Sequence, residues 1–559
     1  MPDTIQDVIA ARIDRLPEVF PDFEYIFKHA LTQEVAYGSL LVQRRKELHR
    51  LIAVTIEDLY RDRLAEHYEV LPHHFEKAEV WDKALGYLMR AADKAARAFA
   101  TRDALALYDA AEAMVDRLRD GVPVDTRMAI HRGRAELYVL VSDFERARAE
   151  WEEVRRQARQ TGDRHAEGGA LVAMGQASWL GHHFDQSLED SRQAAEIAEA
   201  IGAPSILAGS LLNEAVVYEV TGEIAGRLAE ARTKFDRALA LSRQANDVVN
   251  QAGALVFGAE IEGWEGHFAR AAQLYDEGIR LGRAHNVLVP VLEGMFMSGV
   301  NFTGQGTYDS ALDILEEGLG LAERVGDENY TPRYLNSLGW LYMECGDLDR
   351  ARELNQRAAE GGRKRGDHES FANAELNLGD IALLNGDLPL ARDYLEGVHR
   401  LIEDSATSEW MRWRYSIHLF ASLGELALAR GDLAGAREHA DECVERATRT
   451  RSRKYLVKGW RMRGEIATAR RMWEDAERAL REALAVAEFI GNPIQLWKTH
   501  VAVGELHSER KTPDAARQAY GAARNVIERI KSRLHNPGLR ASLESAPLIR
   551  RVYELTVRA

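Results

Sequence analysis

Apolar residues recur along this chain at the spacing of an amphipathic helix. In residues 335–342 they fall three or four positions apart and mark one apolar face. Gly346 and Asp347 end this helix, because glycine adopts the left-handed cap and aspartate caps the helix that follows. A second apolar face follows in residues 351–358. The pattern predicts two antiparallel helices joined by a tight turn.

The same helix pair recurs at an interval of 40 residues over much of the chain. In each copy a small residue is followed twelve positions later by an alanine, and we expect the two to face each other where the helices approach closely. The pairs include Ala92 and Ala104, Gly299 and Ala311, Gly339 and Ala351, Gly379 and Ala391, Gly424 and Ala436, Gly464 and Ala476, and Gly504 and Ala516. A fixed period of this length predicts a repeat solenoid without strands.

One copy resembles a tetratricopeptide repeat. That family has small residues at the eighth and twentieth positions, an aromatic residue near the eleventh and a small residue near the twenty-seventh. The matching residues are Gly339, Ala351, Tyr342 and Ala358, in that order. The resemblance implies an all-α fold, a right-handed α-solenoid of helix pairs. Its ordinary unit has about 34 residues, and a period of 40 is similar to the long repeats of large bacterial signalling ATPases and MalT-type regulators.

We expect the chain to have three parts. Residues 65–530 form the solenoid, of about twelve repeats, and residues 531–559 form a capping helix or tail. Residues 5–18 and 23–60 resemble segments found after the ATPase module of bacterial proteins that join a class III nucleotidyl cyclase, a STAND-type AAA-like ATPase and a tetratricopeptide array. In those proteins a winged-helix segment separates the two stretches. Residues 1–64 are therefore expected to be a helical remnant with an incomplete winged helix.

Composition narrows the classes of partner. The formal net charge is −15, which argues against general nucleic-acid binding. No apolar run of 18 residues and no signal-peptide pattern is present, so we expect a cytoplasmic protein without a membrane partner. The two cysteines, Cys345 and Cys443, are expected to be small core residues without a disulfide bond.

Sequence patterns of catalysis are missing. The chain has no P-loop sequence and no Gly-Lys dipeptide, so it lacks the loop and lysine that hold nucleotide phosphates. Hydrolase, zincin and kinase patterns are absent as well, and we expect neither enzyme activity nor a cofactor. His67, His73 and His74 form the one histidine cluster. Pro72 interrupts their helix, so the sequence favours packing over a metal site.

The concave face is the better candidate for a site, because the resemblance implies that the first helix of each repeat lines it. At the ninth repeat position, Asp380, Glu425, Glu465 and Glu505 are expected to form an acidic stripe. The alternative is that these carboxylates are simply solvated. Aromatic residues beside polar groups are plausible peptide anchors. The neighbouring candidates are Trp179, Phe296, Arg333, Asn336, Trp340, Asn373, Asn377 and Arg461.

These features favour a non-catalytic scaffold that binds a protein or peptide. The resemblance implies a sensor or regulatory role in bacterial signalling, acting on an ATPase or a cyclase carried by another chain. A second interpretation is the C-terminal fragment of a cyclase or ATPase whose catalytic domains are missing from this chain. A third is part of a MalT-like transcriptional regulator, although no DNA-binding helix-turn-helix is identified. The sequence leaves a stand-alone protein, a split partner and a decayed remnant open.

Overall fold

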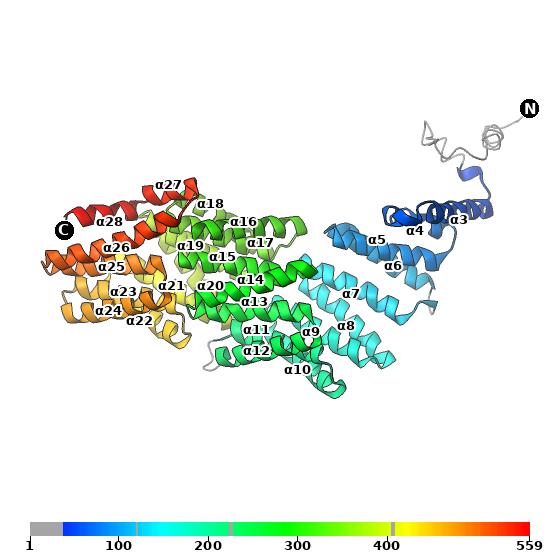
Figure 1. Ribbon diagram of the computed structural model, residues 1–559, viewed down its shortest axis with the longest axis horizontal. Helices are drawn as coiled ribbons and strands as arrows, with labels where there is room; N and C mark the ends of the chain where they lie inside the picture. The colour runs from blue at the N-terminus through cyan, green and yellow to red at the C-terminus, as the bar shows by residue number, and fades with distance from the viewer. Residues whose placement is uncertain (1–36, 119–120, 223–226, 404–408, 559) are drawn as a thin grey trace, which may run out of the picture. The chain divides into compact units, whose positions relative to one another are not determined.

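A computed structural model describes residues 37–118, 121–222, 227–403 and 409–558 (Figure 1). Within these residues every regular element is a helix, and most consecutive helices of each unit pack against each other. The expected all-α solenoid is confirmed. Residues 5–18 and the first part of the segment 23–60, which carry the resemblance to cyclase-linked proteins, lie outside the described residues.

The chain divides between Leu137 and Tyr138 into two compact units. The boundary expected after residue 64 remains a prediction. The described elements of the first unit, with one helix that continues past its end, are α3 (Val42–Leu59), the 3-10 helix η1 (Arg61–His67), α4 (Leu71–Lys77), α5 (Trp81–Arg97), α6 (Thr101–Leu118) and α7 (Val124–Leu140).

Histidines of the first unit pack against one another. The Nδ1 atoms of His49 and His74 are 2.9 Å apart, and the Tyr37 hydroxyl lies 3.0 Å from Nε2 of His49. The ring of His73 meets the ring of His49 edge to face. Burial lowers the pKa of His49 and of His74, which favours neutral rings in this cluster. Among the described residues, no group of three His, Cys, Asp or Glu side chains is placed to hold a metal ion.

The second unit continues the helix pairs to the C-terminus. Its helices are α8 (Phe144–Thr161), α9 (Arg164–Leu180), α10 (Phe184–Ile201), α11 (Pro204–Val220), α12 (Arg227–Ala245), α13 (Val248–Trp264), α14 (Phe268–His285), α15 (Leu288–Gln305), α16 (Tyr308–Val325), α17 (Tyr330–Glu344), α18 (Leu348–Arg365), α19 (His368–Leu384), α20 (Leu388–Glu403), α21 (Glu409–Ala429), α22 (Leu433–Arg449), α23 (Arg453–Ala469), α24 (Trp473–Ile490), α25 (Pro493–Glu509), α26 (Pro513–Arg533), α27 (Pro537–Ser545) and α28 (Pro547–Arg558). None of the helices searched in the described part is both long and apolar enough to cross a bilayer.

The predicted Gly-Asp turns form as expected. Gly346 has a φ of +83°, in the left-handed region that favours glycine, and Asp347 accepts a hydrogen bond from the backbone N–H of Arg350. Gly366 ends α18 with a φ of +70°, and Asp367 caps α19. These turns set the antiparallel helices of each pair. The two cysteines are buried free thiols, as predicted.

The glycine inside the first helix of a pair packs differently from the prediction. A Cβ at Gly504 would lie 2.4 Å from Cε1 of Tyr520, and one at Gly464 would lie 2.4 Å from Cγ of Leu480. Each partner is sixteen residues on, one turn beyond the buried alanine that was expected to face the glycine. Side chains on a helix lean toward its N-terminus, so the larger side chain one turn further on covers the glycine. The alanine at the twelfth position, such as Ala516 with 1% exposure, lets the backbones approach.

Successive turns of the solenoid touch each other in the second unit. The indole Nε1 of Trp264 donates to the backbone carbonyl of Thr450, 186 residues away, at 2.7 Å. The backbone N–H groups of His535 and Asn536 donate to the carboxylate of Asp309 at 2.6 and 2.9 Å. In Figure 1 the red helix α27 accordingly lies near the green helices α16 and α18. These contacts close the concave side of the array.

Candidate functional site

Closure of the array leaves a cavity of about 620 Å³ on the concave side of the second unit. The first helices of nine successive pairs line it, namely α9, α11, α13, α15, α17, α19, α21, α23 and α25. Residues 546–549, at the junction of α27 and α28, contribute to the wall. The volume falls in the range of about 300–1,000 Å³ that small-ligand sites occupy.

The structure brings most of the candidates from the sequence together at this cavity. Those that line it are Trp179, Phe296, Arg333, Asn336, Trp340, Asn373, Asn377, Asp380 and Glu425. Arg461, Glu465 and Glu505 are not among the lining residues. Arg461 is buried and donates to Gln495 at 2.7 Å. Glu465 lies 3.7 Å from Arg461, and Glu505 pairs at 2.7 Å with Arg551 of α28.

The four expected stripe carboxylates are paired rather than open to a partner. Asp380 accepts from the Ser422 hydroxyl at 2.5 Å and lies 2.9 Å from Nε2 of His418. Burial acts to raise the pKa of Asp380, but His418 and Lys458 hold it well below the usual range. Glu425 lies 3.4 Å from the guanidinium of Arg461. Each of the four carboxylates thus has a basic neighbour, and only Asp380 and Glu425 line the cavity.

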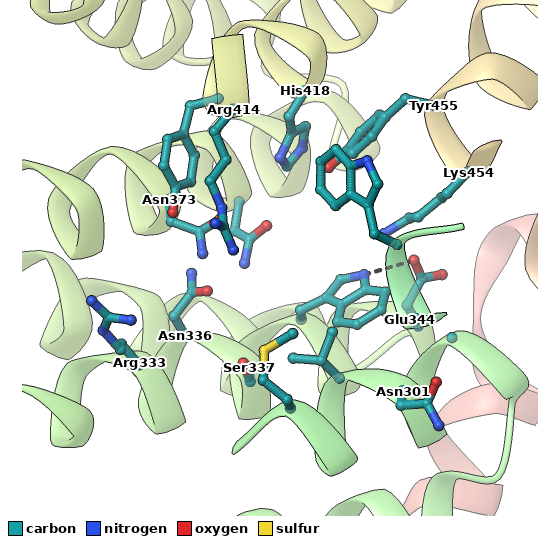
Figure 2. A pocket seen from close by; sticks show the side chains of 18 of the residues that line it. Asn301, Arg333, Asn336, Ser337, Glu344, Asn373, Arg414, His418, Lys454 and Tyr455 are labelled. Carbon is teal, nitrogen blue, oxygen red and sulfur yellow. Dashed lines mark hydrogen bonds between the residues drawn. The ribbon is translucent and has the colours of Figure 1, made fainter. Parts of the chain in front are cut away.

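Amide side chains make up the middle of the cavity wall. Asn336 and Asn377 each donate to the Asn355 side chain, at 2.9 and 3.1 Å. Asn373, one turn before Asn377 on α19, is half-buried and has no hydrogen-bond partner among the described residues. Figure 2 shows Asn336, Asn373 and Arg414 pointing toward one another across the pocket. Each amide carries donors and an acceptor, the combination that a peptide group requires.

One end of the cavity holds buried carboxylates and guanidiniums. Arg333 and Glu369 pair at 2.6 Å, and the Tyr415 hydroxyl donates to the same carboxylate at 2.5 Å. Arg414 approaches Glu219 at 3.8 Å. Burial acts to raise the pKa of Glu369, yet Arg333 and its other cationic neighbours hold it well below the usual range. This carboxylate is therefore ionised at neutral pH.

Glu260 differs from the other carboxylates at this end. Its side chain is 7% exposed, and no hydrogen bond to it is found among the described residues; its Oε1 atom is fully buried. Burial raises the pKa of Glu260 well above its usual value, and the neighbouring Glu293 and Glu219 raise it further. Burial and the like charges of its neighbours therefore favour the protonated form of Glu260.

The other end of the cavity carries lysines and aromatic rings. The Lys454 ammonium sits 4.0 Å from the ring centre of Trp340, close enough for a cation–π interaction. The Trp340 indole N–H donates to Glu344 at 2.9 Å, the dashed line in Figure 2. Lys498, on α25, lies 5.7 Å from the ring of Trp497.

Several lining residues were missed by the sequence reasoning. Arg414 follows the step of 45 residues between Gly379 and Gly424, where the 40-residue register is lost. Lys454 and Lys498 lie outside the repeat positions that were considered. The sequence of helix α15 could have identified Glu293, because it is the one ionisable residue in a helix whose other residues are apolar or uncharged.

Comparison with known proteins gives a likeness in helical arrangement only. No family model and no curated protein matches the chain. Among solved structures, the Rap conjugation gene regulator of plasmid pLS20, in complex with a Phr peptide, is 14% identical over 58% of this chain and 96% of its own, with a TM-score of 0.45. Apo RapI is 12% identical over 65% and 97%, with a TM-score of 0.40. The hetero-tetramer Cut9-Hcn1 of the APC/C is 15% identical over 92% and 99%, with a TM-score of 0.36. These values assign the chain to no family, and its solenoid fold rests on the arrangement of its own helices.

Proposed function

We propose that this chain is a non-catalytic binding protein whose second unit takes a short peptide in this cavity. The observation that carries the proposal is the amide group of Asn373, which faces the cavity without a partner among the described residues. It lies beside Asn336 and Asn377, so a row of amides is available to the main chain of an extended ligand.

Apolar and aromatic groups complement the amides. Phe296, Trp340 and Trp179 line the cavity and supply surfaces on which side chains of a peptide bury apolar area. A cavity of about 620 Å³ suits a segment of a few residues better than a folded partner.

One constellation in the wall has the residue types of a hydrolase, and its geometry opposes that role. The Ser422 hydroxyl donates to Asp380, and His418 contacts the other oxygen of the same carboxylate. A nucleophilic serine requires a hydrogen bond to the histidine that takes its proton. Ser422 is also fully buried. The three groups therefore stabilise the wall, and binding is the function favoured here.

The resemblance of residues 5–18 and 23–60 to cyclase-linked and ATPase-linked proteins supports a regulatory output. On this proposal, occupancy of the cavity changes the action of a signalling ATPase or cyclase on another chain, in the cytoplasm. A C-terminal fragment of such an enzyme, or part of a MalT-like regulator, would use the same cavity as its sensor. The test is copurification from the native cell with the tagged full chain. A separate ATPase or cyclase should copurify, and substitution of the cavity residues should change its recovery.

Binding is tested with the full chain and a random pentapeptide pool, by affinity ultrafiltration and mass spectrometry of the retained peptides. Asn373→Ala should weaken the binding of retained peptides about fivefold to thirtyfold, because it removes one or two hydrogen bonds of about 1 kcal/mol each. Asn385→Ala is the matched control, since Asn385 is exposed at the end of the same helix. Failure of the wild-type chain to retain any peptide refutes the proposed function.

A further inference from the structure

The two ends of the cavity differ in charge, and this difference gives a ligand a direction. We propose that the cavity takes a peptide with free termini, its carboxylate held by Lys454 and Lys498 and its ammonium held by Glu260. The inference rests on the proposed function and deepens it, because it names the class of peptide and its orientation.

At the basic end two ammonium groups lack an anionic partner. Lys458 is paired with Glu425 at 4.0 Å, whereas Lys454 and Lys498 have no carboxylate of the described residues within that distance. Burial lowers the pKa of Lys454 to about 8, and the nearby Lys458 and Lys498 add to this effect. A carboxylate at this place would relieve the repulsion among the three lysines.

Two acidic groups, Glu344 and Asp380, act on Lys454. Asp380 is engaged by Ser422 and His418, and Glu344 is engaged as well. Its carboxylate accepts the Trp340 indole N–H at 2.9 Å, and it acts to raise the pKa of Lys454. The pair retains a positive charge that a ligand carboxylate can balance.

Segments from distant repeats meet at the turn after α13. The loops before α23 and α25 lie against this turn. Trp264 bonds to Thr450 there, and a Cβ at Gly266 would lie 2.6 Å from Cγ2 of Ile490. The comparison of the free pool with the amidated pool that carries one glutamate, described below, distinguishes a C-terminal carboxylate from an acidic side chain.

The acidic end has the opposite imbalance. Its lining includes Arg333, Arg414 and His182, whose Nε2 lies 3.5 Å from Glu369, together with the carboxylates Glu219, Glu260, Glu293 and Glu369. Burial raises the pKa of Glu219, Glu260 and Glu293, and among the described residues Glu260 has no hydrogen-bond partner. A ligand ammonium beside these carboxylates supplies a compensating charge.

The amides lie between these ends. Figure 2 shows Arg333 and Asn336 on one side of the pocket and Lys454 with Glu344 on the other, with Asn373 on the side of Arg333. A peptide that runs from the carboxylates to the lysines therefore passes the amides with its main chain. A peptide with a blocked N-terminus or C-terminus would leave the charge at the corresponding end of the cavity unbalanced.

The test compares four random pentapeptide pools on the full chain: free termini, N-acetylated, C-amidated, and both ends blocked. Retention is measured by affinity ultrafiltration and mass spectrometry. Amidation should lower retention by the wild-type chain at least about tenfold, the loss expected for a charge-assisted contact. Lys454→Met with Lys498→Met should bind free and amidated pools equally. Lys364→Met, an exposed position on α18, is the matched control.

The same design covers the acidic end. Acetylation should lower retention by the wild-type chain, and Glu260→Gln should remove that difference, with Glu360→Gln on the exposed face of α18 as control. A fifth pool, amidated and carrying one glutamate, tests the source of the carboxylate. Equal retention of this pool and the free pool overturns the assignment to the C-terminus.

The outcomes separate the two proposals. If no pool is retained, the proposed function fails. If all pools are retained equally, the cavity binds peptides but the inferred direction is wrong. If the Lys454 and Lys498 double variant still binds the amidated pool more weakly than the free pool, the inference is also wrong. The comparison of pools on the wild-type chain needs no variant, so it stands even if a substitution impairs folding.

Discussion

Gly504→Ala tests the packing rule that builds the whole array. The added Cβ would lie 2.4, 2.5 and 2.8 Å from three ring atoms of Tyr520. The ring cannot move aside freely, because Tyr520 is 2% exposed and its hydroxyl lies 3.1 Å from that of Ser508. Overpacking of this kind costs about 1–3 kcal/mol. The gain in helix propensity, about 1 kcal/mol, offsets only part of this cost.

Gly521→Ala provides the control, because it removes a helical glycine that meets nothing. Nothing lies within 4 Å of a Cβ placed at Gly521, in the interior of α26. That variant should gain about 0.5–1 kcal/mol of stability. The propensity gain is common to both variants, so the difference between their free energies of unfolding isolates the steric cost, about 1–3 kcal/mol.

The measurement must report on α25 and α26, since long repeat arrays do not unfold in one step. Hydrogen exchange of the backbone amides in these two helices is suitable. In a Tyr520→Ala background the cost of Gly504→Ala should vanish, because the clashing ring is gone. Equal effects of the Gly504 and Gly521 variants would show that the side chain sixteen residues on does not occupy the space above the glycine.

Two further predictions concern the cavity and its closure. The pKa of Glu260 is raised in the folded protein, so stability contributed by its proton is lost as pH rises above the unfolded value of 4.5. The melting temperature of Glu260→Gln minus that of the wild-type chain should therefore increase from pH 4.5 to pH 8. If this difference does not change with pH, the assignment of Glu260 as a buried carboxyl group without a partner is wrong. Trp264→Phe removes the bond to Thr450 and should cost about 1 kcal/mol. Amide exchange around Thr450 should rise while α17 and α18 stay protected, and uniform exchange across the unit would argue against closure at this contact.

Local features of the fold were predictable because neighbouring residues determine them. The turn at Gly346 and Asp347 depends on a left-handed glycine and on a side-chain cap, both properties of two or three residues. The 40-residue period likewise identified the lining helices, so Trp340 and Asn373 were expected on the concave face and lie there. The partners of Gly464 and Gly504 were misplaced by one turn, because spacing alone ignores the tilt of side chains along a helix.

The 40-residue period could not predict that repeats far apart in the sequence contact each other. Trp264 and Thr450 meet because small rotations between repeats add up over several units, and a repeat pattern does not specify those rotations. The pairing of the charged residues could not be predicted for the same reason. Asp380 was expected on an open stripe, but His418 neutralises it from the next first helix, α21, after the lengthened step in the register.

The partnerless carboxyl group gives the cavity a selectivity that its shape alone would not provide. Burial of Glu260 without a hydrogen bond destabilises the empty protein, and glutamine or an apolar residue would remove much of that cost. The packing of the array does not depend on this carboxyl group, since its neighbour Ala259 makes the close contact of α13 within the core. An apolar ligand would leave the cost in place, whereas an ammonium would remove it. The free-energy cost of burying Glu260 therefore makes the cavity bind a positively charged ligand more tightly than an uncharged one.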